Sequence, residues 1–416
     1  MSLSENLTWR GLIKDKTFAD NKWLDMPQTF YHGVDASSDS MTIGNLAAMM
    51  LARRLIDAGW KAVILAGGAT SLIGDPGGKS SERELKPREE IQKNVEAIKQ
   101  QINKLFAGKD FVPVDNYDWF KDIGYLEFLR DVGKNFSMAE LMQRDFITER
   151  MGEGASGISY AEFSYSLIQG YDFWHLNKNH GVVLQIGASD QWGNMLSGVS
   201  LIRKKEGAEV NAFSMPLVID KTTGKKFGKS EGGAIWLDPV KTTPTQFYQF
   251  WINTDDADVG DYLKYYSLKP KGEIEQVMSA QKADPASRVA QKALAEELTH
   301  MVHGSQDNTA ATTVTRYLTS QVSIGEASAE DLAAIRQELS SVKVESGSPI
   351  IATLVEAGLA SSNSDARRLL ASGSIYINGK PINDTKNNLS EADFLNGRLL
   401  LRRGKAYKDS ALVELK

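Results

Sequence analysis

The 416-residue sequence contains no cysteine and only five histidines. Without cysteine there are no disulfides, no thiol nucleophile and no zinc site built on thiolates. The sequence also has no uninterrupted apolar stretch of about 18 residues, the length that a membrane span requires. Its first residues, 1–6, are polar and contain no apolar signal core. These absences predict a cytoplasmic chain that does not enter a membrane.

Few residues are available to hold a metal ion. His300 and His303 are three positions apart, as two ligands on one helix would be, but Gly304 is expected to end that helix before a third ligand, Asp307, is reached. We therefore predict no metal site in the protein itself.

The charge balance differs between the whole chain and its C-terminal part. The net charge of −5 argues against a chain that coats nucleic acid along its whole length. Residues 350–416, however, carry ten Lys and Arg against seven Asp and Glu. A local basic surface is therefore expected near the C-terminus.

Strands and helices are expected to alternate in the first half of the chain. Residues 28–35, 61–66 and 182–186 have the apolar character of buried parallel strands, and helices are expected after each. This pattern predicts an α/β fold with an open, Rossmann-like parallel sheet. In such sheets ligands bind outside the carboxyl ends of the strands, so the polar residues that follow each strand are candidate site residues.

The helix expected over residues 159–179 carries a regular polar stripe. Tyr165, Gln169 and Asp172 fall at positions i, i+4 and i+7, so they share one face of the helix. Because their neighbours are apolar, these groups are expected to be buried, where polar groups need partners. A ligand-binding role and a purely structural role both fit this pattern.

A similar choice arises after the strand at 182–186. Gly187 and Ala188 are followed by Asp190 at the start of a helix, an arrangement that suits a ribose or another polar ligand. A plain helix cap by Ser189 or Asp190 is the alternative.

Two segments rich in glycine and cationic residues are candidate anion sites. The run 221–233 contains Lys226 and Lys229 in a flexible turn, and the loop 73–83 contains Lys79 and Arg83 near an expected helix start. Mobile ammonium groups and accessible backbone N–H groups suit a polyphosphate. A solvated surface turn remains the alternative for the first segment. Neither segment is a P-loop, because the required glycine is absent.

Short motifs follow one another along nearly the whole chain. They are residues 67–70 (Gly-Gly-Ala-Thr), 73–76 (Ile-Gly-Asp-Pro), 116–119 (Asn-Tyr-Asp-Trp), 163–165 (Phe-Ser-Tyr), 169–173 (Gln-Gly-Tyr-Asp-Phe), 185–187 (Gln-Ile-Gly), 189–194 (Ser-Asp-Gln-Trp-Gly-Asn) and 247–253 (Phe-Tyr-Gln-Phe-Trp-Ile-Asn). With 37–45 and 226–230 in the places of two signature loops, this order resembles the class I aminoacyl-tRNA synthetases, specifically those of the bacterial tyrosyl type.

The last part of the chain is similar to an S4 RNA-binding domain. Residues 364–370 correspond to its arginine-bearing helix and residues 375–380 to the following strand and turn. Four regions are expected: a Rossmann-like catalytic domain with an inserted helical connective region at 1–220, a signature-loop and helical subdomain at 221–322, a linker at 323–348, and a small α+β S4-like domain at 349–416.

The resemblance implies an ATP-dependent tyrosine–tRNA ligase. The tyrosine carboxylate would attack the α-phosphate of ATP, with Mg²⁺ on the phosphates, and the tyrosyl group would pass to the 3′ end of tRNA(Tyr). This first step needs no general base, because the carboxylate is already ionised; catalysis consists of positioning and charge stabilisation. The family forms homodimers, and the aromatic stretch 116–136 is expected near the subunit interface.

Residue roles follow by position. The implied catalytic residues are Lys226, Lys229, Thr42, Asn45, Lys79 and Arg83. The implied tyrosine-binding residues are Tyr31, Asp75, Asn116, Tyr165, Gln169, Asp172 and Gln185. The implied ATP-binding residues are Gly33, Asp35, Ser37, Gly44, Gly187, Asp190, Gln191, Lys229 and Ser230. The implied tRNA-binding residues are Arg367, Arg368, Lys380, Arg402 and Arg403.

The sequence departs from the family pattern at a few of these positions. Two histidines of the first signature loop are replaced by Thr42 and Asn45, a proline by Ala36, and a glycine by Ala188. The run Thr-Ile-Gly-Asn is typical of bacterial tryptophanyl-tRNA synthetases, which are one alternative. The other is a catalytically impaired paralogue that binds RNA. Tyr31 paired with Asp172 favours tyrosine over tryptophan.

The run 221–233, called here the lysine–glycine turn, provides a direct test. If Lys229 stabilises mainly the transition state, Lys229→Ala slows adenylate formation at saturating tyrosine by on the order of 10²-fold. Single-turnover measurement of tyrosyl-adenylate checks this, and an unchanged rate removes Lys229 from the mechanism.

Overall fold

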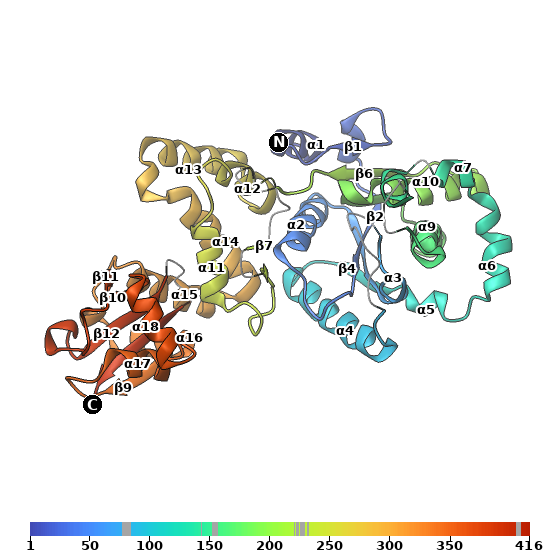
Figure 1. Cartoon of the computed structure of the whole chain (residues 1–416). Helices are drawn as coiled ribbons and strands as arrows, with labels where there is room; N and C mark the ends of the chain where they lie inside the picture. Colours follow the sequence, from blue (N-terminus) through green and yellow to red (C-terminus); the bar gives the residue numbers. More distant parts are fainter. Residues whose placement is uncertain are drawn as a thin grey trace. The chain divides into compact units, whose positions relative to one another are not determined.

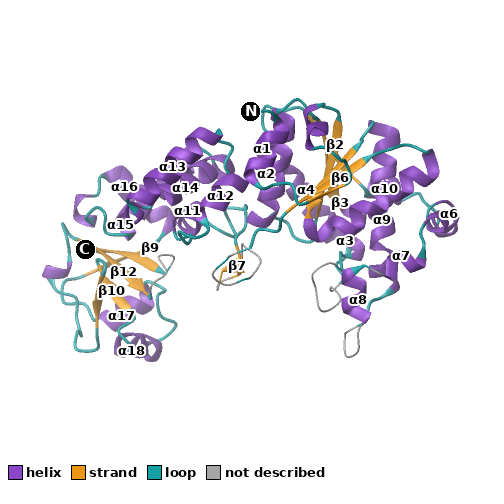
Figure 2. Cartoon of the chain, turned by 90° about the horizontal axis from the view of Figure 1, so that it is seen from above, coloured by secondary structure: helices purple, strands orange, loops and turns teal. Residues whose placement is uncertain are grey.

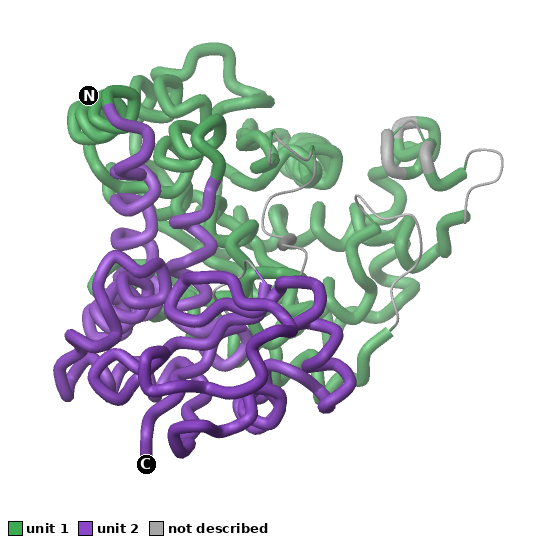
Figure 3. Tube along the Cα trace, turned by 60° about the vertical axis from the view of Figure 1, so that its left-hand side comes forward, with its two compact units in different colours: residues 1–238, 255–283 green, residues 239–254, 284–416 purple. Residues whose placement is uncertain are grey.

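The computed structural model describes residues 1–76, 85–142, 144–151, 157–219, 221, 224, 229–230, 233–404 and 409–416. These residues form two compact units, coloured separately in Figure 3. The first unit comprises residues 1–238 and 255–283, and the second comprises residues 239–254 and 284–416.

The first unit is built on a six-stranded sheet in the order β1-β6-β5-β2-β3-β4. Only the pairing of β1 with β6 is antiparallel. The strands are β1 (Asp15–Lys16), β2 (Thr29–Asp35), β3 (Lys61–Gly67), β4 (Phe111–Asp115), β5 (Leu184–Ala188) and β6 (Asn211–Met215). The chain order reverses between β2 and β5, which makes this pair the topological switch point of a Rossmann-like sheet. The predicted α/β fold is confirmed.

Helices cover both faces of this sheet. In Figures 1 and 2, α2 and α4 lie on one face and α9 and α10 on the other. The helices of the unit are α1 (Leu3–Arg10), α2 (Ile43–Asp57), α3 (Gly68–Ile73), α4 (Arg88–Leu105), α5 (Tyr117–Phe120), α6 (Tyr125–Asp131), α7 (Met138–Met142), α8 (Asp145–Met151), α9 (Tyr160–His180), α10 (Trp192–Glu206), α12 (Val259–Tyr266) and α13 (Lys271–Ala283). Burial from both sides explains why β3 is apolar after its first residue.

Local signals fix the ends of α9, the helix with the polar stripe. The Ser159 hydroxyl accepts a hydrogen bond from the backbone N of Glu162, and the Glu162 carboxylate accepts one from the backbone N of Ser159. Gly181 ends the helix with a φ of 64°. The observed helix spans Tyr160–His180, close to the expected 159–179. These caps set the length of α9 and satisfy backbone groups at its two ends.

The second unit contains a five-stranded sheet in the order β11-β10-β12-β13-β9. Its strands are β9 (Ser340–Val344), β10 (Ile375–Ile377), β11 (Lys380–Ile382), β12 (Arg398–Arg403) and β13 (Ser410–Leu415). Its helices are α11 (Pro244–Ile252), α14 (Val289–His303), α15 (Ser305–Leu318), α16 (Ala329–Glu338), α17 (Ile350–Glu356) and α18 (Asn363–Ala371).

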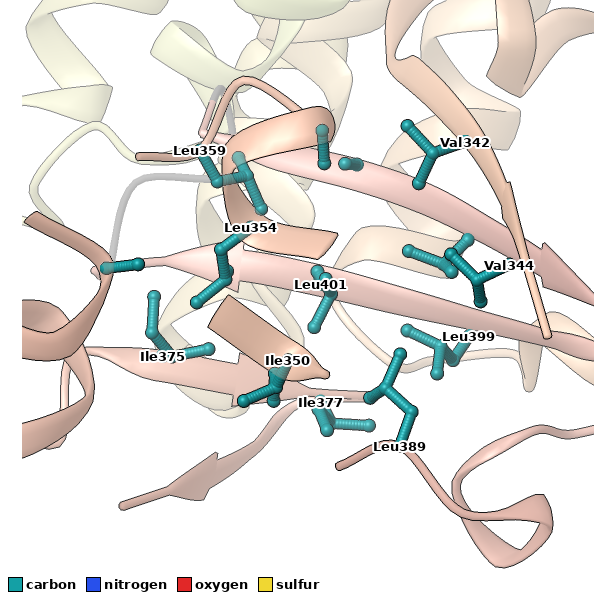
Figure 4. Close-up of a cluster of buried hydrophobic side chains, with 14 of the residues drawn as sticks. Val342, Val344, Ile350, Leu354, Leu359, Ile375, Ile377, Leu389, Leu399 and Leu401 are labelled. Carbon is teal, nitrogen blue, oxygen red and sulfur yellow. The ribbon is translucent and has the colours of Figure 1, made fainter. Parts of the chain in front are cut away.

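Alternation along β12 gives this sheet two apolar faces. Leu399 and Leu401 join a core with Ile350 and Leu354 of α17, shown in Figure 4. Leu400, between them, joins a separate core formed with α15 and α16. Period-2 alternation therefore places helices on both sides of the sheet.

The units divide the chain differently from the regions expected from sequence. Residues 323–348, expected as a linker, contain α16 and the edge strand β9, which pairs in parallel with β13. Val342 and Val344 alternate along β9 and are buried in the α17 core, a signal obscured by the surrounding Ser, Glu and Gly. The expected subdomain 221–322 is also shared: α12 and α13 belong to the first unit, whereas α11, α14 and α15 belong to the second.

Two short strands, β7 (Lys229–Ser230) and β8 (Gly233–Ala234), form an antiparallel pair in the first unit. Across the ranges that the structure describes, no helix has the length and apolar character to cross a bilayer.

Close packing of α9 on α10 depends on a missing side chain. A Cβ atom at Gly198 would lie 2.6 Å from the Cβ of Phe173. Gly198→Ala should therefore destabilise the fold by about 1–3 kcal/mol through overpacking, despite the higher helix propensity of alanine. Urea unfolding measures this.

Gly193, on the same helix, is the matched control. A Cβ atom there would lie 3.7 Å from the Cδ of Arg144, an ordinary contact. Gly193→Ala should leave the unfolding midpoint unchanged or raise it. Equal effects of the two substitutions would contradict this account of the α9–α10 contact.

Candidate active site

A cavity of about 400 Å³ opens at the carboxyl ends of β2 and β5, the switch point of the sheet. Its volume is in the range of small-molecule sites. The predicted site residues that line it are Tyr31, Gly33, Asp35, Ser37, Thr42, Gly44, Asn45, Asp75, Tyr165, Gln169, Asp172, Gln185, Gly187, Asp190 and Gln191. The structure thus brings together groups from β2, β5, α2, α9 and the loops that follow α3 and β5.

Tyr31 and Gln185 form one wall of the cavity. They are paired in register on the neighbouring parallel strands β2 and β5, so their side chains lie on the same face of the sheet. The Tyr31 hydroxyl and the Gln185 side-chain oxygen are both buried and have no hydrogen-bond partner among the residues that the structure describes. Buried polar atoms without partners are costly, so this wall is suited to a ligand that supplies hydrogen bonds.

Asp172, on α9, is a buried carboxyl of the site. It is 2% exposed, and its carboxyl oxygens accept hydrogen bonds from Asn116 Nδ2 (3.1 Å) and Trp119 Nε1 (2.9 Å). Burial raises the pKa of Asp172 to about 8, although both hydrogen bonds lower it. Burial and the nearby Asp172 carboxyl also raise the pKa of Tyr31 well above its usual value.

Two further carboxyls are held by defined partners. The Tyr165 hydroxyl donates to Asp35 Oδ2 at 2.9 Å, across the cavity from α9 to the end of β2. Asp75 Oδ2 accepts from Gln191 Nε2 at 2.6 Å, and Asn194 in turn donates to Gln191 Oε1 at 3.1 Å. Gly74, with a φ of 84°, turns the chain out of α3 just before Asp75.

The described lining of the cavity is acidic. It contains Asp35, Asp75, Asp172 and Asp190 and no Lys or Arg. Such a lining attracts an ammonium group but repels phosphate. Cationic groups for a phosphate would therefore have to come from outside this described lining.

Thr42 and Asn45, where the family has histidines, bond to one another at the start of α2. Asn45 Oδ1 accepts from the Thr42 backbone N (2.9 Å) and from the Thr42 hydroxyl (3.0 Å). The two side chains thus close the first turn of α2, an arrangement typical of a helix N-cap. The Asn45 Nδ2 group is then a donor at the rim of the cavity.

Some predicted site residues are not among those lining the cavity. Asn116 is fully buried behind it, where it donates to Asp172 and accepts from the backbone N of Ala69 (2.7 Å). Its geometry is that of a support for Asp172 rather than a direct contact for tyrosine. Lys79, Arg83 and Lys226 lie outside the described residues, as do the side chains of Lys229 and Ser230.

His32 lines the cavity but was not predicted as a site residue. Its Nδ1 lies 3.1 Å from the Ile186 carbonyl oxygen, and burial lowers its pKa. Its buried Nε2 has no hydrogen-bond partner in the described part of the chain. Sequence reasoning missed it because Tyr31, Gly33 and Asp35 alternate on one face of β2, whereas His32 lies on the other. Residues 215–218, the last residue of β6 and the three that follow it, also line the cavity, and the carboxyl-end rule applied to β6 would have found them.

The predicted RNA-binding residues lie in the second unit. Arg367 and Arg368 are exposed on α18, and Lys380 is exposed on β11. Arg402 stacks over the ring of its cross-strand partner Tyr376, 4.6 Å from the ring centroid. Arg403 donates a hydrogen bond to the Leu359 carbonyl and forms an ion pair with Asp409, so its side chain also has structural contacts within the second unit.

Comparison with known proteins agrees with this geometry. Residues 25–319 match the family model for class I tRNA synthetases of the W and Y type, and residues 331–408 match the tyrosine–tRNA ligase SYY-like C-terminal domain. The tyrosine–tRNA ligase of Listeria monocytogenes is 41% identical over 417 residues, which cover 97% of this chain and 98% of the relative. The chain belongs to the tyrosyl-tRNA synthetase family.

Other tRNA synthetases also match, at different levels of similarity. Tyrosine–tRNA ligase 2 of Bacillus cereus is 41% identical over 425 residues, which cover both chains completely. A C-terminally truncated mitochondrial tyrosyl-tRNA synthetase of Aspergillus nidulans superposes with a TM-score of 0.68 at 32% identity, covering 76% of this chain and 94% of that one. A tryptophanyl-tRNA synthetase of Encephalitozoon cuniculi shares the fold, with a TM-score of 0.53 at 17% identity.

The raised pKa of Asp172 gives this synthetase a pH-dependent stability. An unfolded aspartate loses its proton near pH 4, whereas folded Asp172 keeps it up to about pH 8. The folded state binds more protons in this window, so this group lowers the free energy of unfolding as the pH rises through it. Asp172→Asn removes the effect, so the variant should gain stability relative to wild type between about pH 5 and 8.

Urea unfolding of both proteins at several pH values measures the difference. The exposed Asp110→Asn variant controls for the loss of one carboxylate. A wild-type-minus-variant difference that stays constant across the window would show that Asp172 is ionised in the free protein.

Proposed function

We propose that the chain activates L-tyrosine with ATP to tyrosyl-adenylate and pyrophosphate, and then transfers the tyrosyl group to the 3′ end of tRNA(Tyr). The observation that carries this proposal lies in the cavity at the switch point, where the buried Tyr31 hydroxyl and Gln185 side-chain oxygen have no hydrogen-bond partner among the described residues. The Asp172 carboxyl, held by Asn116 and Trp119, lines the same cavity. Identity of 41% to tyrosine–tRNA ligases over the whole chain supports it.

The phenolic hydroxyl of tyrosine is proposed to bind between Tyr31 and Asp172. Phenylalanine in the same place would leave the Tyr31 hydroxyl without a hydrogen bond and would give Asp172 none from the ligand, which is the physical basis for rejecting it. Asp75, Tyr165 and Gln169 would hold the ammonium group, for which the acidic lining is suited. Asn116 is proposed to act through Asp172, by holding its carboxyl in place.

ATP is proposed to occupy the other side of the cavity. Its ribose and base would lie against the strand ends and the first turn of α2; the residues proposed for this contact are Gly33, Asp35, Ser37, Gly44, Gly187, Asp190 and Gln191. In the described part of the chain, no three His, Asp or Glu residues are grouped as metal ligands. The Mg²⁺ that we propose would therefore be held mainly by phosphate oxygens and water, as is usual for this ion.

Catalysis is proposed to consist of alignment and charge neutralisation. The tyrosine carboxylate attacks the α-phosphorus, the bond to the bridging oxygen breaks, and negative charge moves to pyrophosphate. Asn45 would donate a hydrogen bond from its Nδ2 near the phosphates, and Thr42 would hold the Asn45 side chain in place through its own bonds to Oδ1. Because the described lining has no cation, the proposal assigns neutralisation to Lys79, Arg83, Lys226 and Lys229, with Ser230 as a further ATP contact.

We also propose that the enzyme is a cytoplasmic homodimer. Large apolar side chains are exposed along the connective region between α6 and the start of α9: Tyr125, Leu126, Met138, Met142, Met151 and Tyr160. Exposed apolar patches of this kind mark interaction surfaces. In our proposal, Arg367, Arg368, Lys380, Arg402 and Arg403 contact tRNA phosphates, and residues 1–220 contain the amino-acid-activation site.

Each alternative function is less well supported. A tryptophan enzyme would have no use for the unpaired Tyr31 hydroxyl and the buried Asp172 carboxyl, which both suit a phenol. A catalytically dead RNA-binding paralogue would have no reason to keep Asp75, Tyr165 and Gln169 around one cavity.

Tyr31→Phe tests the recognition of the phenol. The substitution removes only a hydroxyl that makes no hydrogen bond to any described residue, so folding should be preserved. In ATP–pyrophosphate exchange, kcat/KM for tyrosine should fall by about 10-fold, as expected for one lost hydrogen bond, while the value for phenylalanine stays the same.

Tyr171→Phe is the matched control, because Tyr171 packs among Phe120, Phe128 and Trp174 and does not line the cavity. It should leave exchange unchanged. The proposed function is wrong if the wild-type protein shows no exchange with tyrosine, or exchanges faster with tryptophan.

A further inference from the structure

Helix α12 (Val259–Tyr266) forms hydrogen bonds with two segments whose relative position matters for the proposed reaction: the start of α2 and the chain just before the lysine–glycine turn. The Tyr266 hydroxyl donates to the Ile43 carbonyl at 3.0 Å, and the Tyr262 hydroxyl donates to the Ile219 carbonyl at 3.3 Å. Ile43 lies between Thr42 and Asn45 at the start of α2. Ile219 lies just before the lysine–glycine turn. Both tyrosine rings are buried.

Lys221, at the start of the lysine–glycine turn, is held by residues just before α12 and in the first helical turn of α12. The Lys221 backbone N donates to Asp258 Oδ1 at 3.3 Å, and its ammonium group contacts Asp261 Oδ2 at 2.6 Å and the Ala257 carbonyl at 3.1 Å. The Lys221 side chain is 54% exposed, so this ion pair adds little to stability. Its effect is to fix the position of the chain at Lys221.

The last turn of α12 is clamped by two buried guanidinium groups. Arg10 of α1 donates to the carbonyls of Lys264 (2.8 Å) and Ser267 (2.9 Å), and Arg54 of α2 donates to the Ser267 carbonyl at 2.6 Å. Cations at a helix C-terminus satisfy its free carbonyls and complement the helix dipole. Through Arg54 and Tyr266, α12 is therefore fixed to both ends of α2.

The chain that follows the lysine–glycine turn forms hydrogen bonds with the start of α2. The Ile43 backbone N donates to the Ile235 carbonyl (3.1 Å), and the Leu237 N donates to the Met41 carbonyl (2.9 Å). Ile219 and Lys221 are thus tied to α12, Ile235 and Leu237 are tied to the start of α2, and α12 joins the two.

We propose that α12 is a positioning helix for adenylate formation, and that Tyr266 and Tyr262 are positioning residues that set the first turn of α2 against the start of the lysine–glycine turn. The inference rests on the proposed function. Neither tyrosine lines the cavity, so both act through the backbone they hold. Since small displacements of aligned groups are costly to rate, losing either bond should slow the chemical step without weakening tyrosine binding.

Tyr266→Phe and Tyr262→Phe test this in the full-length protein. The readouts are tyrosyl-adenylate formation in single turnover at saturating tyrosine and ATP, and the Kd for tyrosine without ATP. Each variant should lower the rate on the order of 10-fold while the Kd stays close to the wild-type value. If one variant does not fold, the other carries the test.

Tyr317→Phe, in the second unit, is the control for loss of a tyrosine hydrogen bond. Its hydroxyl donates to Asp331 Oδ2 at 2.8 Å, far along the chain from these segments. It should lower thermal stability and leave the rate unchanged. The inference is overturned if the α12 variants lose stability but keep the wild-type rate, or if their Kd for tyrosine rises in proportion to the loss of rate. A wild-type protein that forms no tyrosyl-adenylate overturns the proposed function instead.

Discussion

The buried carboxyl of Asp172 is the group on which the arrangement of the site depends. A carboxyl at 2% exposure is stable only with partners, and Asn116 and Trp119 supply them. Asn116 is held in turn by the backbone of Ala69 and the hydroxyl of Thr70, in the glycine-rich segment that follows β3. The first unit therefore converges on this carboxyl from β3, α5 and α9. Asp172 lies on the face of α9 that lines the cavity at the sheet's switch point, and α9 packs closely on α10 through Phe173 and Gly198.

Charge separates the two tasks of the proposed reaction. The described cavity lining is acidic and contains unpaired buried oxygen atoms, which suits the ammonium and phenol of tyrosine. The candidate phosphate-binding lysines and arginine all come from two glycine-rich segments. At the start of α2, the Thr42–Asn45 pair caps the helix with a carbonyl oxygen and leaves the amide donor of Asn45 available. Helix α12 fixes the backbone at the start of α2 and the backbone just before the lysine–glycine turn.

Much of the fold was predictable from the sequence. Continuous apolar runs identified β3 and β5, and the i, i+4, i+7 spacing of Tyr165, Gln169 and Asp172 indicated a helix face that the structure turns into the cavity. Long-range pairing was not predictable. No local pattern shows that Tyr31 and Gln185 are in register, that Asn116 lies behind Asp172, or that β9 completes the second sheet. His32 was missed because strand alternation placed it on the opposite face, although at a switch point both faces border the ligand site.

The central claim is that this cavity selects tyrosine through its phenolic hydroxyl. Calorimetric titration of the purified protein with L-tyrosine, L-phenylalanine and L-tryptophan, each without ATP, tests it most directly. The account predicts saturable binding of tyrosine and an affinity for phenylalanine that is weaker by about 10-fold or more, because phenylalanine cannot form the hydrogen bond of the phenolic hydroxyl. Binding of phenylalanine or tryptophan as tight as that of tyrosine would contradict it.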